Sequence, residues 1–428
     1  MASPDVVVVG LGFTGLPTAV AAAAAGMRVV GLDSCARRIA EVLDARPGSG
    51  LGTVSETALG DALASGRLVV RDVASGVPAG DVHVLCLPTP PDQRGGVDLR
   101  PLAQALRAVA AVLRRGDLVL VQSTCPPGTV AHTLVPVLEE VSGLRAGSAF
   151  HVACAPMRID PGNRAHPLTT IPRVVGGHTA RCAHRAAQFL SSMAHDVVQV
   201  TSTRAAELAK LFENTFRLVN ISLVNEFASV CRAYGVDVAE VLRAAGTKPF
   251  GFLGHQPSAG AGGDCVPVSA RFLSTAARRR GLLSPLVDAA LAINDAMPAR
   301  TVHLLRDTAE RVLAKPLRNC RVLVLGVTYK ADTPNVRQSA AVAVLEELRR
   351  EASAEYHDPH VPELVLSDGT RLRRADLDDR AFDHRAFDLA VLMTPHRHYD
   401  DLPLRGLPVF DCTTGEPRRV VEHVGVAA

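Results

Sequence analysis

A glycine-rich turn between two apolar stretches constrains the fold of this chain more than any other feature. Residues 5–10 read DVVVVG, and the turn continues through Gly12 and Gly15. An alanine-rich stretch follows, and a second apolar stretch ends at Asp33. A continuous apolar run is typical of a strand that is buried on both faces of a parallel sheet. The pattern therefore predicts a strand, a turn, a helix and a second strand, the beginning of an α/β fold.

The spacing of Gly10, Gly12 and Gly15 is that of a dinucleotide-binding turn. Glycines permit a tight turn and close approach of the backbone to a pyrophosphate, which sits on the N-terminus of the following helix. Asp33 lies about 20 residues further on, where a carboxylate accepts from the ribose 2′-hydroxyl. This favours NAD over NADP, although Arg38 is a residue type that can serve a 2′-phosphate.

The strand pattern repeats after residue 80. Apolar stretches at residues 82–87 and 118–121 end in Pro/Thr-rich segments that contain Thr89 and Thr124. Ligands of open α/β sheets bind beyond the carboxyl ends of the strands, so both threonines are candidates for a binding crevice. The alternative is that they cap the helices that follow. Residues 151–156 and 173–176 resemble further strands of the same domain.

The middle of the chain is predicted to be helical around one loop. Residues 205–234 contain no helix breaker, which predicts one helix about 45 Å long with Lys210 and Asn214 on the same face. Residues 251–272 are rich in glycine and proline and are predicted to form a loop that carries Cys265. This cysteine is either a nucleophile on a substrate loop or a small buried filler.

A second α/β pattern without GxGxxG follows Pro316. Strands are predicted at 321–325, 355–357, 389–393 and 409–410, with a helix over 336–350. The expected organisation is an α/β fold with three domains: residues 1–203, a Rossmann-type NAD domain; 204–314, a central helical and dimerisation domain with the substrate loop; and 315–428, a C-terminal Rossmann-like domain for the nucleotide sugar.

Composition excludes several other classes of protein. The 428 residues carry a net charge of +3 with interspersed charges, which does not indicate nucleic-acid binding. No apolar run is long enough to cross a bilayer. Nine cysteines without CxxC spacing indicate neither a metal site nor a disulfide framework. A cytoplasmic enzyme is expected.

Seven motifs together resemble the UDP-glucose/GDP-mannose dehydrogenase family, the nucleotide-sugar 6-dehydrogenases. They are, in order, GLGFTG, CLPTPP, STCPPGT, AELAKLFENTFR, TKPFGF, GGDC and GVTYKADTPNVRQS. RIDPGN and TKPFGF are most similar to the branch that oxidises UDP-N-acetylhexosamines. The resemblance implies a homodimer formed through the long helix and NAD-dependent oxidation of a C6 alcohol to a carboxylate by two hydride transfers.

The resemblance also implies roles for individual residues. Lys210, Asn214 and Thr124 would serve the oxidation of O6, and Cys265 would form a thioester that water hydrolyses with the help of a base. Lys210 as a cation and Asn214 as a donor would stabilise negative charge on O6. The implied cofactor contacts are Gly10, Gly12, Gly15, Asp33, Arg38, Thr89, Thr124 and Arg337. The implied substrate contacts are Lys210, Asn214, Phe250, Gly262, Gly263 and Lys330.

The sequence departs from the family where proton transfer is assigned. The family has glutamate at the position of Met157 and aspartate at that of Ser269, four residues after Cys265. Asp264 replaces a histidine common in this branch. Both carboxylates are thus missing, although Asp160 or Asp264 could substitute as a base.

This selective loss predicts an oxidation that stops after one two-electron step, at a carbonyl. A secondary alcohol on a sugar longer than six carbons would suit such an enzyme, with Cys265 as a relic or a packing residue. A four-electron enzyme that forms a uronate is the first alternative. An NAD-retaining epimerase or a nucleotide-sugar binding protein is the second. The altered site indicates specialised metabolism; the sugar and the nucleobase, uridine or guanosine, stay open.

Overall fold

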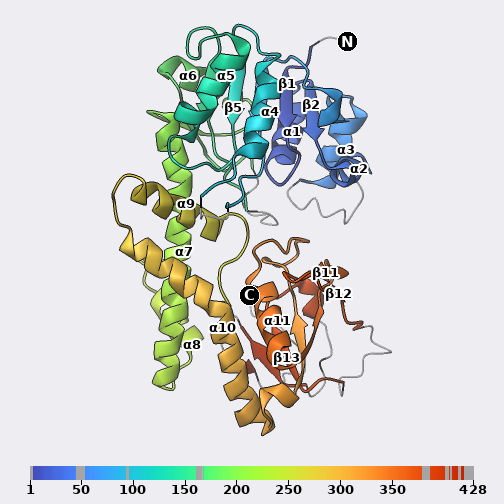
Figure 1. Cartoon of the computed structure of the whole chain (residues 1–428), viewed down its shortest axis with the longest axis vertical. Coiled ribbons are helices and arrows are strands. Elements are labelled where there is room, and N and C mark those ends of the chain that lie inside the picture. The colour runs from blue at the N-terminus through green and yellow to red at the C-terminus, as the bar shows by residue number, and fades with distance from the viewer. Residues whose placement is uncertain are drawn as a thin grey trace. The chain divides into compact units, whose positions relative to one another are not determined.

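The chain folds into two compact units, each made of two segments of sequence (Figure 1). Unit 1 comprises Met1–Glu213 and Arg271–Leu283, and unit 2 comprises Asn214–Ala270 and Ser284–Ala428. The computed structural model describes residues 3–44, 54–92, 96–160, 166, 168–377, 386–400, 404, 407–412 and 416–418. The end of the predicted third domain lies outside these residues.

The first unit contains an eight-stranded sheet in the order β3-β2-β1-β4-β5-β6-β7-β8. Its strands are β1 (Val6–Val9), β2 (Val29–Asp33), β3 (Leu68–Asp72), β4 (Val82–Leu85), β5 (Leu118–Val121), β6 (His151–Cys154), β7 (Arg173–Gly177) and β8 (Val197–Val200). All neighbours are parallel except β6 and β7. The α/β prediction is therefore confirmed, with one antiparallel pair that the sequence did not indicate.

Helices cover both faces of this sheet, which explains the unbroken apolar strands. Val6 and Val8 pack into the core on one face, and Val7 and Val9 into the core on the other. The helices are α1 (Gly15–Ala24), α2 (Ala36–Asp44), α3 (Glu56–Ala64), α4 (Arg100–Ala110), α5 (Val135–Ser142) and α6 (Ala180–Ser191). A strand buried on both faces cannot alternate polar and apolar residues.

Four helices follow the first sheet. The predicted long helix is α7 (Thr203–Ala233), 31 residues long, and the division into units falls within it. It is followed by α8 (Val238–Gly246), α9 (Val266–Arg278) and α10 (Pro285–Leu313). The prediction of a loop over 251–272 is wrong at its end, because α9 begins directly after Cys265. Pro267 misled the prediction, since proline fits the first turn of a helix, where its missing N–H is not needed.

The second unit contains a smaller sheet in the order β10-β9-β13-β14-β15. Its strands are β9 (Arg321–Leu325), β10 (Ser353–His357), β13 (Leu389–Leu392), β14 (Val409–Asp411) and β15 (Glu416–Arg418), and β11 (Glu363–Val365) pairs with β12 (Arg371–Arg373). Helix α11 (Ala340–Glu351) starts four residues later than predicted. Gln338 has a φ of 50°, which interrupts helical geometry before Ser339.

None of the helices in the described ranges is both long enough and apolar enough to span a membrane.

Candidate active site

The turn after β1 has the geometry of a dinucleotide cradle. Gly10 has a φ of 92°, and a Cβ there would lie 2.6 Å from the carbonyl oxygen of Cys86. A Cβ on Gly15 would lie 1.7 Å from the carbonyl oxygen of Gly10, whereas one on Gly12 would meet no atom within 4 Å. Glycine is therefore required at two positions by the protein's own backbone. At Gly12 the space beside the turn is open.

Asp33 shapes this turn from the end of the neighbouring strand β2. Its Oδ2 accepts the Leu11 N–H at 2.8 Å, and its Oδ1 accepts the Cys35 N–H at 2.9 Å. Each oxygen keeps a second lone pair for a ribose hydroxyl. Arg38 pairs with Glu41 at 3.2 Å, so its charge is partly compensated within α2. Among the described side chains none caps α1. The Leu16 N–H donates to the Gly12 carbonyl at 3.2 Å, and the positive end of the helix dipole still favours a pyrophosphate there. These residues fit NAD.

The loops after β4 and β5 lie together at the carboxyl edge of the sheet. The Thr89 hydroxyl donates to the Thr124 carbonyl at 2.6 Å. The Ser123 hydroxyl bridges the same loops by accepting from Leu87 N at 3.0 Å and donating to Leu87 O at 2.8 Å. The structure thus brings the two predicted crevice threonines together. Neither is shown acting as a side-chain cap among the described contacts.

A buried glutamate that the sequence analysis missed accepts hydrogen bonds from the loop that contains Thr124. Glu207 of α7 accepts the N–H groups of Gly128 and Val130 at 2.5 and 2.9 Å. Burial raises the pKa of this carboxyl to about 7, although the two backbone N–H groups oppose the shift. The one available signal was an acidic residue between Ala206 and Leu208 in the motif AELAK.

Met157 lies just beyond β6 against a buried cation. The Arg173 Nη1 approaches the Met157 thioether sulfur at 3.2 Å. Arg173 is only 4% exposed, and no described residue accepts from its Nε or Nη2. Burial lowers the pKa of its guanidinium to about 10. A thioether is only a weak acceptor. Among the described residues no carboxylate pairs with the Arg173 guanidinium, so its buried charge is not balanced.

Arg158, the residue after Met157, has a carboxylate partner. The Arg158 guanidinium pairs with Glu213 of α7, and it also donates to the Pro172 carbonyl at 3.1 Å. Asp160, one of the two carboxylates that could replace the missing base, is partly exposed. Arg158 therefore ties the segment after β6 to α7 through Glu213.

Asn214 and Ser269 are joined by a hydrogen bond within the second unit. The Asn214 Nδ2 donates to the Ser269 Oγ at 2.9 Å and to the Cys265 carbonyl at 3.3 Å. A carbonyl oxygen only accepts, so the amide nitrogen must face it. Both amide protons are thereby used, and Oδ1 is left for other partners. The role expected for Asn214, as a donor to a developing oxyanion, stays a prediction.

Cys265 is exposed, which contradicts the interpretation as a buried filler or packing residue. It lies at the start of α9, where its carbonyl accepts from Ser269 N at 3.0 Å. Next to it, Asp264 lies 3.7 Å from the Arg337 guanidinium, and both side chains are largely exposed. The structure thus places Arg337 beside the substrate loop. It also gives Asp264, the second candidate base, a cationic neighbour.

The glycines of this loop pack against the protein's own residues. A Cβ on Gly262 would lie 2.6 Å from the Gln338 carbonyl oxygen, and one on Gly263 would lie 2.8 Å from the Tyr329 ring. The resemblance implies that both glycines contact the substrate. In the structure they allow close approach of the segment that carries Tyr329 and Lys330. Phe250, another predicted substrate residue, is 71% exposed, and the Lys248 ammonium lies 5.0 Å from its ring centroid.

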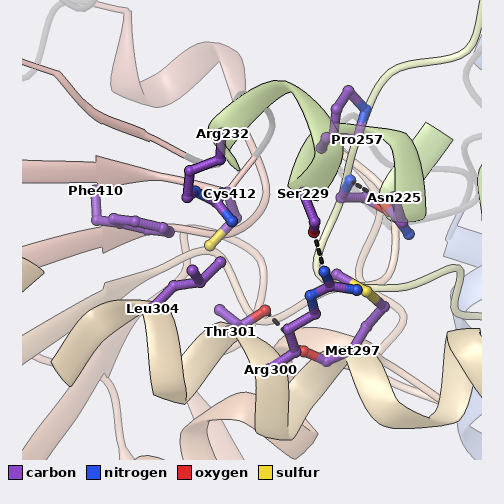
Figure 2. Close-up of a pocket in the computed structure, with 12 residues that line it drawn as sticks. Asn225, Ser229, Arg232, Pro257, Met297, Arg300, Thr301, Leu304, Phe410 and Cys412 are labelled. Atoms are coloured by element: carbon purple, nitrogen blue, oxygen red, sulfur yellow. Dashed lines mark hydrogen bonds between the residues drawn. The ribbon is translucent and has the colours of Figure 1, made fainter. Parts of the chain in front are cut away.

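A pocket in the second unit lies beside the same loop (Figure 2). It is small, with a cavity volume of about 30 Å³. Asn225 Oδ1 accepts the Ser258 N–H at 2.8 Å, while its buried Nδ2 has no partner in the described structure. Figure 2 shows the Arg300 guanidinium of α10 bonded to Ser229 of α7. The lining residues are Asn225, Ala228, Ser229, Arg232, Pro257, Ser258, Met297, Arg300, Thr301, Leu304, Phe410 and Cys412.

The sheet, the glycine turn and Asp33 define a dinucleotide-binding α/β protein. The chain belongs to the UDP-glucose/GDP-mannose dehydrogenase family. Sequence models of the family match its NAD binding domain at residues 4–194, its central domain at 204–296 and its UDP binding domain at 323–413. The predicted family and the predicted cofactor, NAD, are confirmed.

Known relatives agree with this assignment. The chain is 36% identical over 361 residues to a UDP-N-acetyl-D-mannosamine dehydrogenase of Pyrococcus horikoshii, covering 83% of this chain and 84% of that protein. It is 33% identical to a UDP-N-acetyl-D-glucosamine 6-dehydrogenase of Pseudomonas aeruginosa, covering 80% and 79%. A solved UDP-glucose dehydrogenase of Pyrobaculum islandicum matches with a TM-score of 0.81 at 30% identity, covering 97% and 94%. The protein is an NAD-dependent nucleotide-sugar dehydrogenase.

Proposed function

We propose that this enzyme oxidises the C6 hydroxyl of a nucleotide-diphosphate sugar once and releases a carbonyl product. The observation that carries the proposal is Met157, which lies against the buried Arg173 guanidinium. A thioether cannot take a proton from water, and Ser269, at the second acidic position of the family, is buried and bonded to Asn214. Both features argue against thioester hydrolysis, because a general base is worth about 10²–10⁴-fold in rate.

The first oxidation, from the alcohol to the carbonyl, needs no base that activates water. When bound, NAD⁺ takes the hydride that leaves C6. The Lys210 ammonium stabilises the negative charge that develops on O6, and Asn214 Oδ1 accepts the O6 hydroxyl proton in a hydrogen bond that orients it. The proton then leaves to solvent. If C6 is a secondary alcohol, the resulting ketone has no hydrogen on C6 and cannot be oxidised further.

A four-electron reaction that forms a uronate is the second candidate, and the exposed Cys265 favours it. A thiol in the open can attack an aldehyde at C6, whereas a buried one cannot. Asp160 or Asp264 would then have to activate water. Asp264 has the Arg337 guanidinium 3.7 Å away.

The stoichiometry of NADH separates these candidates. UDP- and GDP-linked sugars, with both six-carbon and longer sugars, are supplied to the whole enzyme with NAD⁺, and the product is identified by mass spectrometry. One NADH per sugar and a product lacking two hydrogens is the expected result. Two NADH per sugar and a carboxylate product would overturn the arrested reaction and support the uronate. Absence of NADH release with every sugar would argue against both.

We also propose that the enzyme is a homodimer formed through α7. An apolar stripe runs along the exposed side of this helix with spacings of four or seven residues, which keeps it on one face. Its residues are Leu208, Phe212, Phe216, Leu223 and Val230, followed by Tyr234 just beyond the helix. A stripe of this length is expected to be covered by a partner in water.

Leu223→Asp is expected to convert the dimer into a monomer, because it places a charge in the middle of the stripe. Leu223 is 63% exposed in one protomer, so the substitution should leave the protomer folded. The mass in solution is measured by light scattering. Val365→Asp, which changes a similarly exposed residue on β11, is the matched control and should remain a dimer. A monomeric wild type would contradict the proposal.

A further inference from the structure

The turn after β9 in the second unit repeats the architecture of the NAD turn without its sequence motif. Gly326 has a φ of 81°, and a Cβ there would lie 2.4 Å from the Thr394 carbonyl oxygen. Gly10 is constrained in the same way by Cys86 after β4. Asp358 follows the parallel neighbour β10, as Asp33 ends the parallel neighbour β2. Its Oδ2 accepts the N–H groups of Val327 and Thr328 at 2.8 and 3.2 Å.

The two aspartates differ in what covers them. Asp33 is partly exposed, whereas Asp358 is fully buried. The cover over Asp358 is His396, whose Nε2 lies 3.0 Å from the carboxylate Oδ2 and 3.1 Å from the Thr328 hydroxyl. The Asp358 carboxylate is therefore covered by an imidazole, whereas the Asp33 carboxylate is partly exposed.

His396 also holds the far end of the same loop. Its Nδ1 lies 2.9 Å from the Asp332 backbone nitrogen. A backbone N–H can only donate, so Nδ1 must be the acceptor, and the ring proton sits on Nε2 facing the carboxylate. One side chain thus fixes the beginning of the loop through Asp358 and its end through Asp332.

The residue held between these points is Lys330. Its carbonyl accepts the hydroxyl groups of Thr328 and Thr333 at 3.0 and 2.8 Å. The Thr394 hydroxyl donates to the Thr328 carbonyl at 2.7 Å. The backbone on both sides of Lys330 is therefore tied to the buried Asp358–His396 pair.

We propose that Asp358 and His396 are positioning residues that hold Lys330 for binding of the nucleotide diphosphate. The proposal rests on the substrate role given to Lys330 above. In this turn the chain uses an aspartate and a histidine as an internal support, whereas the turn of the first unit presents its aspartate to a ligand. Fixing the backbone that carries Lys330 leaves less conformational entropy to be lost when its ammonium binds a diphosphate, so binding becomes tighter.

The hydrogen bonds of the same cluster do not suit a metal ion. Ligand atoms of Asp332, His360 and His396 lie within 4.8 Å of one another. However, the Nδ1 lone pair of His396 already accepts the Asp332 N–H, and its Nε2 faces Asp358. A metal on Nδ1 would leave a backbone N–H without its partner.

His396→Ala is expected to weaken binding of UDP, or of GDP if the enzyme proves to use guanosine, by about tenfold, a change equivalent to 1.4 kcal/mol. The Kd of NAD⁺ should stay within about twofold, because the cofactor turn lies in the other unit. Binding of each nucleotide to the whole enzyme is measured by calorimetry, and the KM of the nucleotide sugar should rise with little change in kcat. His396→Asn, which keeps an amide oxygen near the position of Nδ1, should recover part of the affinity.

Tyr356→Phe serves as the matched control for lost stability. Its hydroxyl donates to the Val361 carbonyl at 3.1 Å in the core of the same unit, and none of the contacts described for that hydroxyl reaches the Lys330 loop. It should lower the melting temperature and leave UDP binding unchanged. Unchanged nucleotide binding by His396→Ala would overturn the positioning role, as would equal losses for UDP and NAD⁺. A wild-type enzyme that binds neither UDP nor GDP would instead contradict the proposed function.

Discussion

Replacing Met157 with glutamate is expected to change the main product from a carbonyl to a carboxylate when a six-carbon nucleotide sugar is supplied. The resemblance to the family puts a glutamate at this position, and a general base there should speed thioester hydrolysis by about a hundredfold or more. The measurement is the amount of uronate per NADH, followed by mass spectrometry. Failure of Met157→Glu to form any carboxylate would mean that the missing base is not what stops the reaction.

The structure predicts a second effect of Met157→Glu. The Arg173 guanidinium lies 3.2 Å from the sulfur, so a carboxylate in the same place would pair with it. Adding a partner to a charge that is already buried stabilises the fold, because removing such a partner is costly. The pair also lowers the pKa of the new carboxyl, which makes it a weaker base. We therefore expect a higher melting temperature together with incomplete recovery of hydrolysis.

Two further variants separate the chemistry from the packing. Met157→Gln has a similar shape and can accept from Arg173, but it cannot take a proton, so no carboxylate is expected. Cys265→Ser in the Met157→Glu background removes the thiol and should abolish the new product. If the double variant still forms a uronate, the thioester route is excluded.

Removing the Glu207 side chain is expected to cost about 3 kcal/mol of folding stability, because Glu207→Ala leaves two buried backbone N–H groups without an acceptor. These groups belong to Gly128 and Val130 in the loop after β5. Glu139→Ala is the matched control, since that carboxylate is partly exposed and accepts the Ala146 N–H at 3.0 Å. Its loss should be smaller, because water can replace it. Denaturant unfolding measures both.

The same carboxyl gives a pH dependence with a definite sign. Burial raises its pKa in the folded state to about 7, above the usual 4.5. The folded protein therefore binds more protons than the unfolded chain between these values, and this contribution to stability falls as the pH rises from about 4.5 to 7. The difference in stability between wild type and Glu207→Ala should be larger at pH 5 than at pH 7. An equal difference at both pH values would mean that Glu207 is already ionised in the folded state at pH 5.

Much of the fold could be predicted because its signals are local. The strands β5 and β9 match their predicted ranges, since unbroken apolar runs bounded by turns leave little choice of limits. The start of α9 was placed too late because proline near a helix start looks like a loop residue. The start of α11 was placed too early because no residue type marks the positive φ of Gln338. Whether such a segment is helical depends on backbone bonds, such as that from Ser269 N to the Cys265 carbonyl.

The site residues also divide into those with a local sequence signal and those whose role depends on distant partners. Gly10, Gly12, Gly15 and Asp33 were recognisable because their role depends on backbone geometry within one strand–helix–strand unit. Glu207, Arg173 and His396 were not, because their partners lie far away in the chain. Glu207 reaches Gly128, and His396 reaches Asp358, 79 and 38 residues away in the sequence.

The sequence by itself determined the family, the cofactor and the absence of carboxylates at positions 157 and 269, because these depend on residue identity and on short spacings. Only the tertiary structure decided that Met157 borders an unbalanced cation, that Asn214 contacts Ser269, that Cys265 is exposed, and that His396 covers Asp358. Burial and hydrogen-bond direction depend on atoms brought together from distant segments, and no local pattern encodes which polar group will face which.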